Sequence, residues 1–239
     1  MPRPDGDSLR REFGRGAAAM LPICIAAISI ALVWGTLASE RGLSLAEIGL
    51  MSATVFAGAS QFVAIGLWAT PLPAAAIVFA TFMVNLRHVM MGASLARHMA
   101  AFRGAQRFAA FYALTDEVWA LAEARAMHSR LTPAYYAGLV IPLFVCWISG
   151  TLAGGVFGTG IGRPEAWGLD FVFAAMFIAL IVGFRKTPAW FPVVATSAAV
   201  SALSYQILPA PWYVILGSLT AVGLAAVLNP GDRAQLSRA

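Results

Sequence analysis

Long stretches without a charged residue constrain this chain more than any other feature of its sequence. No Asp, Glu, Lys or Arg occurs in residues 16–39, 48–86, 131–162 and 187–231. A helix needs about 20 apolar residues to cross a hydrocarbon core about 30 Å thick. The first and third runs therefore hold one span each, and the second and fourth are long enough for two. Barrel strands would instead alternate apolar and polar residues, so we predict an all-α, polytopic integral membrane protein.

The composition excludes other classes of protein. Hydrophobic residues make up 60% of the chain and charged residues 11%, whereas a soluble domain carries about a quarter charged residues. Because arginines collect in cytoplasmic loops of membrane proteins, the net charge of +5 indicates a lipid bilayer and not nucleic acid as the partner. The two cysteines, Cys24 and Cys146, lie inside apolar runs and indicate buried thiols. We predict no disulfide, metal site or cofactor.

We predict a single membrane-embedded domain at residues 16–229, between two polar chain ends. Residues 1–15 are polar and rich in arginine, which is typical of a loose cytoplasmic tail. The apolar stretch that follows exceeds the 7–15 residues of a signal-peptide core, so it predicts an uncleaved first span. Residues 230–239 form the second predicted cytoplasmic tail.

The number of spans stays open at six to eight. If every apolar segment crosses, there are eight helices, and the arginines of residues 97–107 lie outside the cell. If residues 47–69 form a re-entrant segment and residues 97–130 remain cytoplasmic, the positive-inside rule is obeyed better. Residues 97–130 then hold an amphipathic surface helix instead of a partly polar span. The other predicted elements cover residues 17–38, 74–95, 134–157, 167–184, 188–208 and 211–228.

A weak internal repeat is visible in the spacing of small residues. Gly42-Leu43-Ser44 precedes Phe56-Ala57-Gly58-Ala59, and Gly168-Leu169-Asp170 precedes Phe173-Ala174-Ala175-Met176. Transporters often contain two such halves with the substrate site between them. Chance recurrence of small residues is the alternative.

The first polar cluster in an apolar run contains Gly58, Ser60 and Gln61. An unwound turn at residues 58–61 would offer free backbone N–H and C=O groups to a substrate, as the broken helices of transporters do. Alternatively, the small residues form a packing face and Gln61 joins two helices through a hydrogen bond.

The second cluster contains Asn85, Arg87 and His88. On a helix, Asn85 and His88 share a face while Arg87 points elsewhere. Arg87 is expected either to extend to the membrane interface or to pair with substrate or with a carboxylate such as Asp116. His88 is either a neutral packing group or a proton carrier.

The third cluster is Thr115-Asp116-Glu117. On a surface helix both carboxylates would face water. In a desolvated position at least one pKa would rise toward neutrality, which suits a proton relay. We therefore take Gly58, Ser60, Gln61, Asn85 and Arg87 as candidates for substrate binding, and Asp116, Glu117 and His88 as candidates for proton coupling.

Several catalytic motifs are missing from the sequence. It has no GxxxxGK[ST] loop for ATP and no HExxH zinc motif, and Gln61 and Phe62 follow Ser60 where a GxSxG elbow would need a glycine. A secondary transporter is therefore the favoured class and an enzyme is not expected. A non-transporting membrane scaffold and an intramembrane enzyme that uses His88 and Asp116 are the alternatives.

The same clusters resemble the AzlC family, the large subunit of two-component branched-chain amino acid transporters. The similarity spans residues 35–182, and two positions depart from the family pattern: Met91 stands where a tyrosine is frequent, and Ala174-Ala175 precede a position where a proline is frequent. The segments that carry it are Gly42-Leu43-Ser44, Phe56–Phe62, Val84–His88, Gly92–Leu95, Leu114–Glu117 and Gly168–Phe171.

The resemblance implies export of valine, leucine or isoleucine, and in some members methionine, across the bacterial inner membrane. It also implies coupling to the proton gradient and a small hydrophobic membrane partner of the AzlD type. It assigns no binding residue, so the candidates above rest on polarity and depth.

Overall fold

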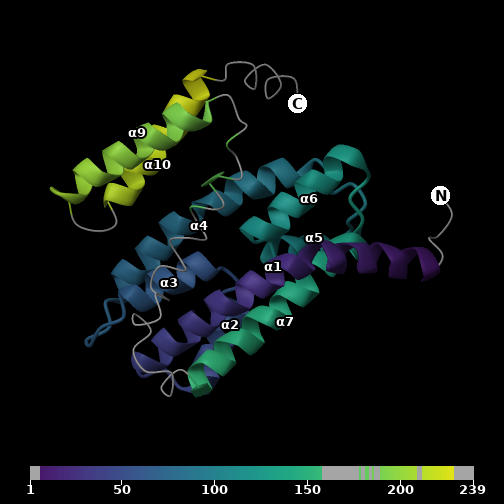
Figure 1. Ribbon diagram of the computed structural model, residues 1–239, viewed down its shortest axis with the longest axis horizontal. Coiled ribbons are helices and arrows are strands. Elements are labelled where there is room, and N and C mark those ends of the chain that lie inside the picture. The colour runs from purple at the N-terminus through teal and green to yellow at the C-terminus, as the bar shows by residue number, and fades with distance from the viewer. Residues whose placement is uncertain are drawn as a thin grey trace. The chain divides into compact units, whose positions relative to one another are not determined.

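All regular structure in the part of the chain described by the computed structural model is α-helical (Figure 1). The described residues are 6–157, 178, 181–182, 185, 189–208 and 212–228. Among them, α1 (Gly6–Glu40), α4 (Ala74–Ala96) and α7 (Pro133–Phe157) are long and apolar enough to cross a membrane. The prediction of an all-α, polytopic membrane protein is confirmed, while the number of spans stays a prediction.

The chain divides into two compact units, residues 1–170 and 171–239. In the first unit, α1 and α7 pack with their backbones in contact. A methyl group on Gly16 would lie 2.2 Å from the Tyr135 carbonyl oxygen, and one on Gly35 would lie 2.0 Å from that of Thr151. The N-terminal part of α1 thus contacts the N-terminal part of α7, and the C-terminal parts of the two helices contact each other. The two helices run parallel and begin at the same end of the unit.

The N-terminal part of α1 is helical, and the expectation of a loose tail over residues 1–15 is wrong for residues 6–15. Glu12 explains the order, because its carboxylate accepts hydrogen bonds from Arg125 at 2.9 and 3.1 Å and from Thr132 at 3.3 Å. The Arg125 guanidinium also lies 4.8 Å from the centre of the Tyr135 ring. These contacts fix the start of α1 to the helices that follow α4.

Helix α4 runs antiparallel to α1 and α7. At its C-terminal end His98 Nε2 lies 3.4 Å from Glu123 Oε2, and Glu123 is one turn or less from Arg125, which binds Glu12 of α1. The end of α4 therefore lies where α1 and α7 begin. This direction favours the interpretation in which residues 97–130 return to the side of the N-terminus.

The segment between α1 and α4 consists of two short helices, α2 (Leu45–Thr54) and α3 (Gly58–Gly66). At 1.5 Å per residue neither exceeds about 15 Å, so neither crosses the hydrocarbon core alone. A capping box formed by Ser44 and Glu47 is present at the start of α2. Arg41 donates a hydrogen bond of 3.0 Å to the Trp68 carbonyl oxygen. Since this bond joins the two ends of the segment, the chain leaves and returns at the same end, as a re-entrant hairpin does.

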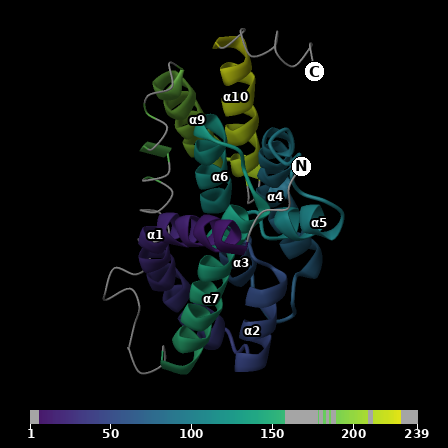
Figure 2. The same cartoon turned by 90° about the vertical axis from the view of Figure 1, so that its right-hand side faces the viewer.

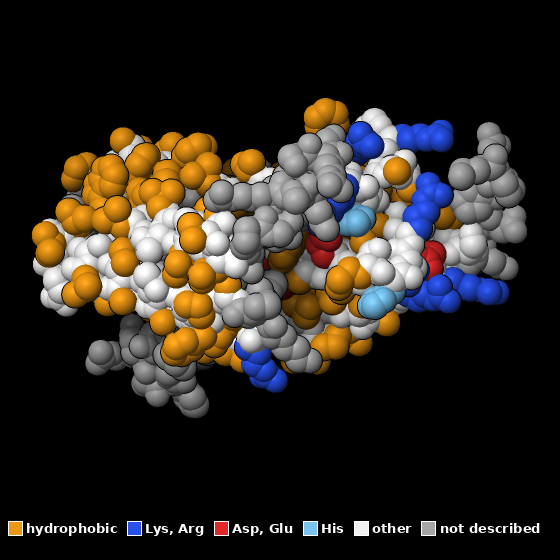
Figure 3. Space-filling model, turned by 90° about the horizontal axis from the view of Figure 1, so that it is seen from above, with side chains coloured by type: hydrophobic (Ala, Val, Ile, Leu, Met, Phe, Trp, Pro, Cys, Tyr) orange, Lys and Arg blue, Asp and Glu red, His pale blue; other side chains and the backbone are white. Residues whose placement is uncertain are grey.

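Residues 97–130 form a second hairpin and not one span or one surface helix. It contains α5 (Ala105–Tyr112) and α6 (Asp116–His128), and Thr115 caps α6 by accepting a hydrogen bond from the Val118 amide at 3.3 Å. The sequence did not show this interruption because Ala109–Ala122 keeps helical apolar spacing through it. In Figure 3 basic side chains lie near acidic and histidine side chains on one part of the surface.

The second unit contains α9 (Trp190–Tyr205) and α10 (Trp212–Leu228), which match the elements predicted at 188–208 and 211–228 (Figure 2). They pack side by side, and Ser197 Oγ donates a hydrogen bond of 2.9 Å to the Gly217 carbonyl oxygen. Residues 168–176, which carry the second half of the predicted repeat, lie outside the described residues. The repeat stays a prediction.

Candidate functional site

The two hairpins meet beside the middle of α4, and we call this meeting point the hairpin junction. The first hairpin contributes Val55–Ala57, where the backbone leaves the helical conformation between α2 and α3 (φ −113°, ψ 74° at Val55; extended, with φ −147°, ψ 90°, at Ala57). The second contributes residues 111–114, where α5 ends. The Tyr112 hydroxyl donates a hydrogen bond to the Ala53 carbonyl oxygen and joins the two tips directly. The junction is thus a place where helical hydrogen bonding is interrupted from both sides.

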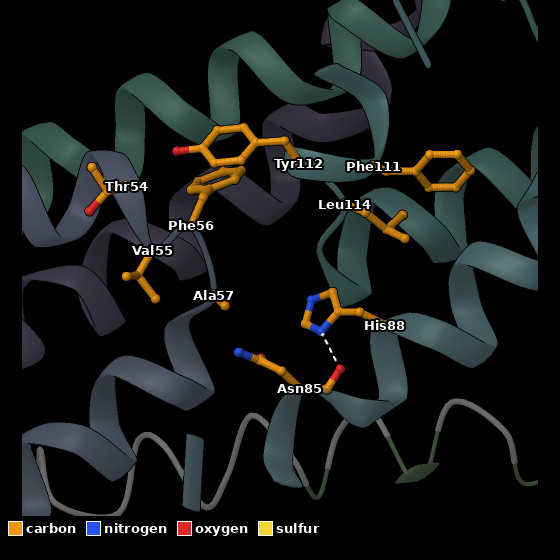
Figure 4. Close-up of a pocket in the computed structure, with 9 residues that line it drawn as sticks. All are labelled: Thr54, Val55, Phe56, Ala57, Asn85, His88, Phe111, Tyr112 and Leu114. Carbon is orange, nitrogen blue, oxygen red and sulfur yellow. Dashed lines mark hydrogen bonds between the residues drawn. The ribbon is translucent and has the colours of Figure 1, made fainter. Parts of the chain in front are cut away.

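A cavity of about 250 Å³ lies at the hairpin junction (Figure 4). In the figure the rings of Phe56 and Tyr112 lie against each other on one side, and Asn85 and His88 face them from α4. The cavity is lined by Thr54, Val55, Phe56, Ala57, Asn85, His88, Phe111, Tyr112 and Leu114. It therefore combines an apolar wall with a polar one.

Hydrogen-bond donors gather on the polar side. Ser60 Oγ donates to Asn85 Oδ1 at 2.6 Å, which turns the Asn85 amide nitrogen toward Ala57 (Figure 4). Ala57 is the N-cap of α3 but makes no side-chain capping bond. The first amides of a helix have no intrahelical acceptor, and this end of the helix carries a partial positive charge. The polar side is thus suited to a carboxylate.

The break in the first hairpin lies earlier than the sequence indicated. An unwound turn at residues 58–61 was one of the two interpretations, but those residues form the first turn of α3, and the helix is interrupted at Val55–Ala57 instead. The reason is packing against α7. A methyl group on Gly58 would lie 2.9 Å from the Trp147 ring, and Gln61 Oε1 accepts a hydrogen bond of 2.9 Å from Trp147 Nε1.

Gly58 and Gln61 thus contact α7 and are not among the residues that line the cavity. Gln61 is fully buried, and its amide nitrogen has no hydrogen-bond partner within the described residues. The side-chain oxygen of Gln61 therefore joins α3 to α7, which was the alternative interpretation of this residue.

The ion pair considered for Arg87 is present. Its Nη2 lies 3.0 Å from Asp116 Oδ2, and both side chains are largely buried. The pair joins α4 to the first turn of α6. Two further contacts hold these helices together, because Ser94 Oγ accepts a hydrogen bond from Trp119 Nε1 at 2.8 Å and donates one to Glu123 at 2.7 Å. Asp116 is therefore fixed opposite Arg87 and its charge is balanced.

Glu117 differs from its neighbour. Burial raises the pKa of the Glu117 carboxyl above its ordinary value, and the negative charge of Asp116 adds to the shift. Hydrogen bonds from its own backbone amide and from Thr115, together with the charge of Arg87, oppose this shift only in part. The environment of Glu117 thus favours a bound proton.

His88 lies on the wall of the cavity. Its Nδ1 is 3.2 Å from the Asn85 carbonyl oxygen on the preceding turn of α4. A neutral ring in this position donates from Nδ1 and leaves Nε2 as an acceptor. The predicted proximity of Asn85 and His88 on one helix face is confirmed, since both line the cavity.

Seven cavity residues were not among the predicted site residues: Thr54, Val55, Phe56, Ala57, Phe111, Tyr112 and Leu114. Each flanks a polar cluster, with Thr54–Ala57 just before Gly58 and Phe111–Leu114 just before Thr115. Their position beside the clusters is the one signal that could have identified them, because apolar residues are common throughout this chain.

Comparison with known proteins assigns the family. Residues 22–161, more than half of the chain, match the family described as AzlC protein. The chain belongs to the AzlC family. An uncharacterized membrane protein of Archaeoglobus fulgidus is 30% identical over 228 residues, which is 92% of each chain. This AzlC chain is also 29% identical to the inner membrane protein YgaZ of Escherichia coli, over 85% of its own length and 84% of YgaZ.

A third relative of this AzlC chain carries a function in its name. The branched-chain amino acid transport protein AzlC of Bacillus subtilis is 24% identical over 222 residues, covering 91% of this chain and 85% of the relative. No solved structure gives a significant match. Together with the apolar helices, the family supports a membrane protein concerned with transport.

Proposed function

We propose that this AzlC-family chain is the large subunit of a secondary transporter that exports branched-chain amino acids across the bacterial inner membrane. Valine, leucine and isoleucine are the proposed substrates, and methionine is a further candidate. The relative named as a branched-chain amino acid transport protein supports this substrate class. The partner would be a small hydrophobic subunit of the AzlD type, and both termini would lie in the cytoplasm.

The hairpin junction is the observation that carries the proposal. Asn85 and His88 lie near the middle of α4, and Phe56 packs against Phe144 near the middle of α7. Transporters bind substrate near the bilayer midplane, where discontinuous helices present free backbone groups. Irregular backbone at this depth is tolerated only where it is buried in protein or lines a cavity. Both hairpins have their interruptions at this cavity.

The substrate carboxylate would bind at the N-terminus of α3, beside the Asn85 amide that Ser60 orients. Gly58 and Gln61 support this position from the α7 side. Arg87 serves the site through Asp116, because its guanidinium is paired at 3.0 Å. Among the candidate substrate-binding residues, Asn85 is the one whose side chain lines the cavity.

Proton coupling would use the second hairpin. Burial raises the pKa of Glu117, so this carboxyl binds a proton more readily than an exposed glutamate. Asp116 holds α6 against α4 through Arg87. His88 lies on the cavity wall, within reach of a bound ammonium or carboxylate group. Proton uptake at Glu117 or His88 would change the charge next to the substrate without a covalent step.

Efflux of radiolabelled leucine or valine from vesicles tests the proposal. The full-length chain, alone and with the small partner subunit, is reconstituted and an inward or outward pH gradient is imposed. We expect efflux that follows the gradient and disappears when a protonophore collapses it. Folded protein that moves no branched-chain amino acid under either gradient, with the partner present, would refute the transporter.

A further inference from the structure

We infer that the apolar wall of the hairpin junction is the subsite for the aliphatic side chain of the substrate, with Phe56 setting the largest side chain accepted. This inference rests on the proposed export of amino acids. It assigns a role to cavity residues that the polar clusters did not include, and it places the two ends of the substrate on opposite sides of the cavity.

The size of the cavity favours a small ligand. Its volume of about 250 Å³ lies below the roughly 300–1,000 Å³ of pockets for drug-sized ligands. A free amino acid has a charged end and, in this class, an apolar end. The cavity has the same two kinds of surface, because Asn85 and His88 lie on one side and the rings of Phe56 and Tyr112 on the other (Figure 4).

Phe56 is the rigid part of the wall. Its side chain is only 6% exposed, and its ring packs edge to face on Phe144 with centroids 5.1 Å apart and an angle of 67°. Phe144 belongs to α7, whose backbone is packed directly on α1. Phe56 therefore cannot move aside for a larger ligand without disturbing the most closely packed helices of the unit.

The second hairpin completes the apolar lining of the cavity. Leu114 is buried, and the Tyr112 hydroxyl bond to the Ala53 carbonyl oxygen fixes its ring over Phe56 (Figure 4). Ala57 lines the cavity between Phe56 and Asn85 (Figure 4). The size of the residue at position 57 and the ring at position 56 thus limit the space from two sides.

Two substitutions with opposite effects test this subsite. Phe56→Ala enlarges the cavity and Ala57→Leu fills it, and Phe82→Ala removes an exposed phenylalanine from α4 outside the junction as a matched control. One methylene in an apolar pocket changes selectivity by about 10–200-fold. We expect Phe56→Ala to raise export of phenylalanine relative to leucine by about tenfold or more. Ala57→Leu should lower export of leucine relative to alanine by a similar factor, and Phe82→Ala should change neither ratio.

The readouts separate this inference from the proposed function. Competition by alanine, valine, leucine and phenylalanine is measured on efflux in vesicles and, for purified full-length protein, on the thermal shift caused by each amino acid. If the unchanged protein binds and exports leucine but neither junction variant shifts the selectivity, the subsite is wrong and the transporter stands. If the unchanged protein neither binds nor moves any amino acid, the transporter fails and the subsite with it. If Phe56→Ala does not fold, an unchanged selectivity in Ala57→Leu alone still refutes the subsite.

Discussion

The α1–α7 pair and the hairpin junction use small and polar residues for opposite purposes. In the pair, Gly16 and Gly35 allow two long helices to touch backbone to backbone over their length. Lipid offers no hydrophobic gain for bringing helices together, so close van der Waals contact between small residues provides the attraction. At the junction the helices stop, and Ala57 opens α3 without a side-chain cap. The α1–α7 pair is therefore rigid, whereas the hairpin junction leaves backbone groups available for hydrogen bonds to a ligand.

The hydrogen bonds of the two regions differ in the same way. Thr36 of the pair is buried and donates to the Leu32 carbonyl oxygen at 2.9 Å within its own helix and lies 3.4 Å from that of Gly154. At the junction, polar groups bind side chains from other helices, as Ser60 does with Asn85 and Arg87 with Asp116. A pairwise polar contact between separate elements can be exchanged for a substrate contact. A bond within one helix cannot be exchanged so easily.

Gly35→Val, in the α1–α7 pair, should have the largest effect. Its first added carbon would lie 2.0 Å from the Thr151 carbonyl oxygen, so backbone must move, at a cost of about 3 kcal/mol or more in unfolding free energy. Thermal unfolding of the detergent-solubilised protein measures this. Gly14→Ala in the same helix is the control, because nothing lies within 4 Å of that position, and it should stabilise by about 0.5–1 kcal/mol. Equal stability of the two variants would disprove close packing of α1 on α7.

Asp116→Asn should have the next largest effect, at the junction. Removing one partner of a buried ion pair costs about 3–5 kcal/mol, and since both side chains here are partly exposed we expect about 1–2 kcal/mol. The protein should still insert in the membrane, yet export should be lost because α6 no longer fixes its position on α4. The double variant Arg87→Gln/Asp116→Asn should regain stability but not export. Full export by Asp116→Asn would remove this residue from the mechanism.

Glu117→Gln should change how the stability of the protein depends on pH. Because burial raises the pKa of Glu117 in the folded protein, the folded state keeps this proton at pH values where the unfolded chain has released it. The free energy of unfolding should therefore fall as pH rises from about 4.3, the ordinary value, to the raised pKa. The slope is about 1.4 kcal/mol for each pH unit in that window.

Glu117→Gln removes this slope, and it should also make export independent of pH over the same window. Unfolding by denaturant at several pH values and efflux at matched pH on both sides are the measurements. A pH slope that persists in the variant would assign the proton to another group.

Ser52→Ala should have the smallest effect. Ser52 Oγ donates to Thr151 Oγ1 at 3.0 Å between α2 and α7, and such a bond between membrane helices contributes about 0.6 kcal/mol. Thr151 keeps its bond to the Ile148 carbonyl oxygen at 3.0 Å, so no buried group is left without a partner. Thermal unfolding should shift slightly and export should not change. A loss of export would mean that the Ser52–Thr151 bond positions the first hairpin for transport.

The sequence was sufficient to predict a helical membrane protein and to locate its polar groups along the chain. The charge-free runs indicate that the helices lie in lipid. Helices α4, α7, α9 and α10 begin and end close to the predicted residues, because the length and polarity of each apolar run set those limits. The polar clusters could also be recognised, since Asn85, Arg87 and Asp116 stand out against an apolar background.

The way in which those clusters are brought together follows from tertiary contacts and could not be predicted from the sequence. The interruption at Val55–Ala57 depends on Trp147 holding Gly58 and Gln61 in α3, and Trp147 is distant in the sequence. The direction of α4 depends on the contacts of His98 and Arg125, and it brings the two hairpin tips to one cavity. Helical propensity and apolar spacing are local properties, whereas a cavity between two hairpins exists only through contacts between residues that lie far apart along the chain.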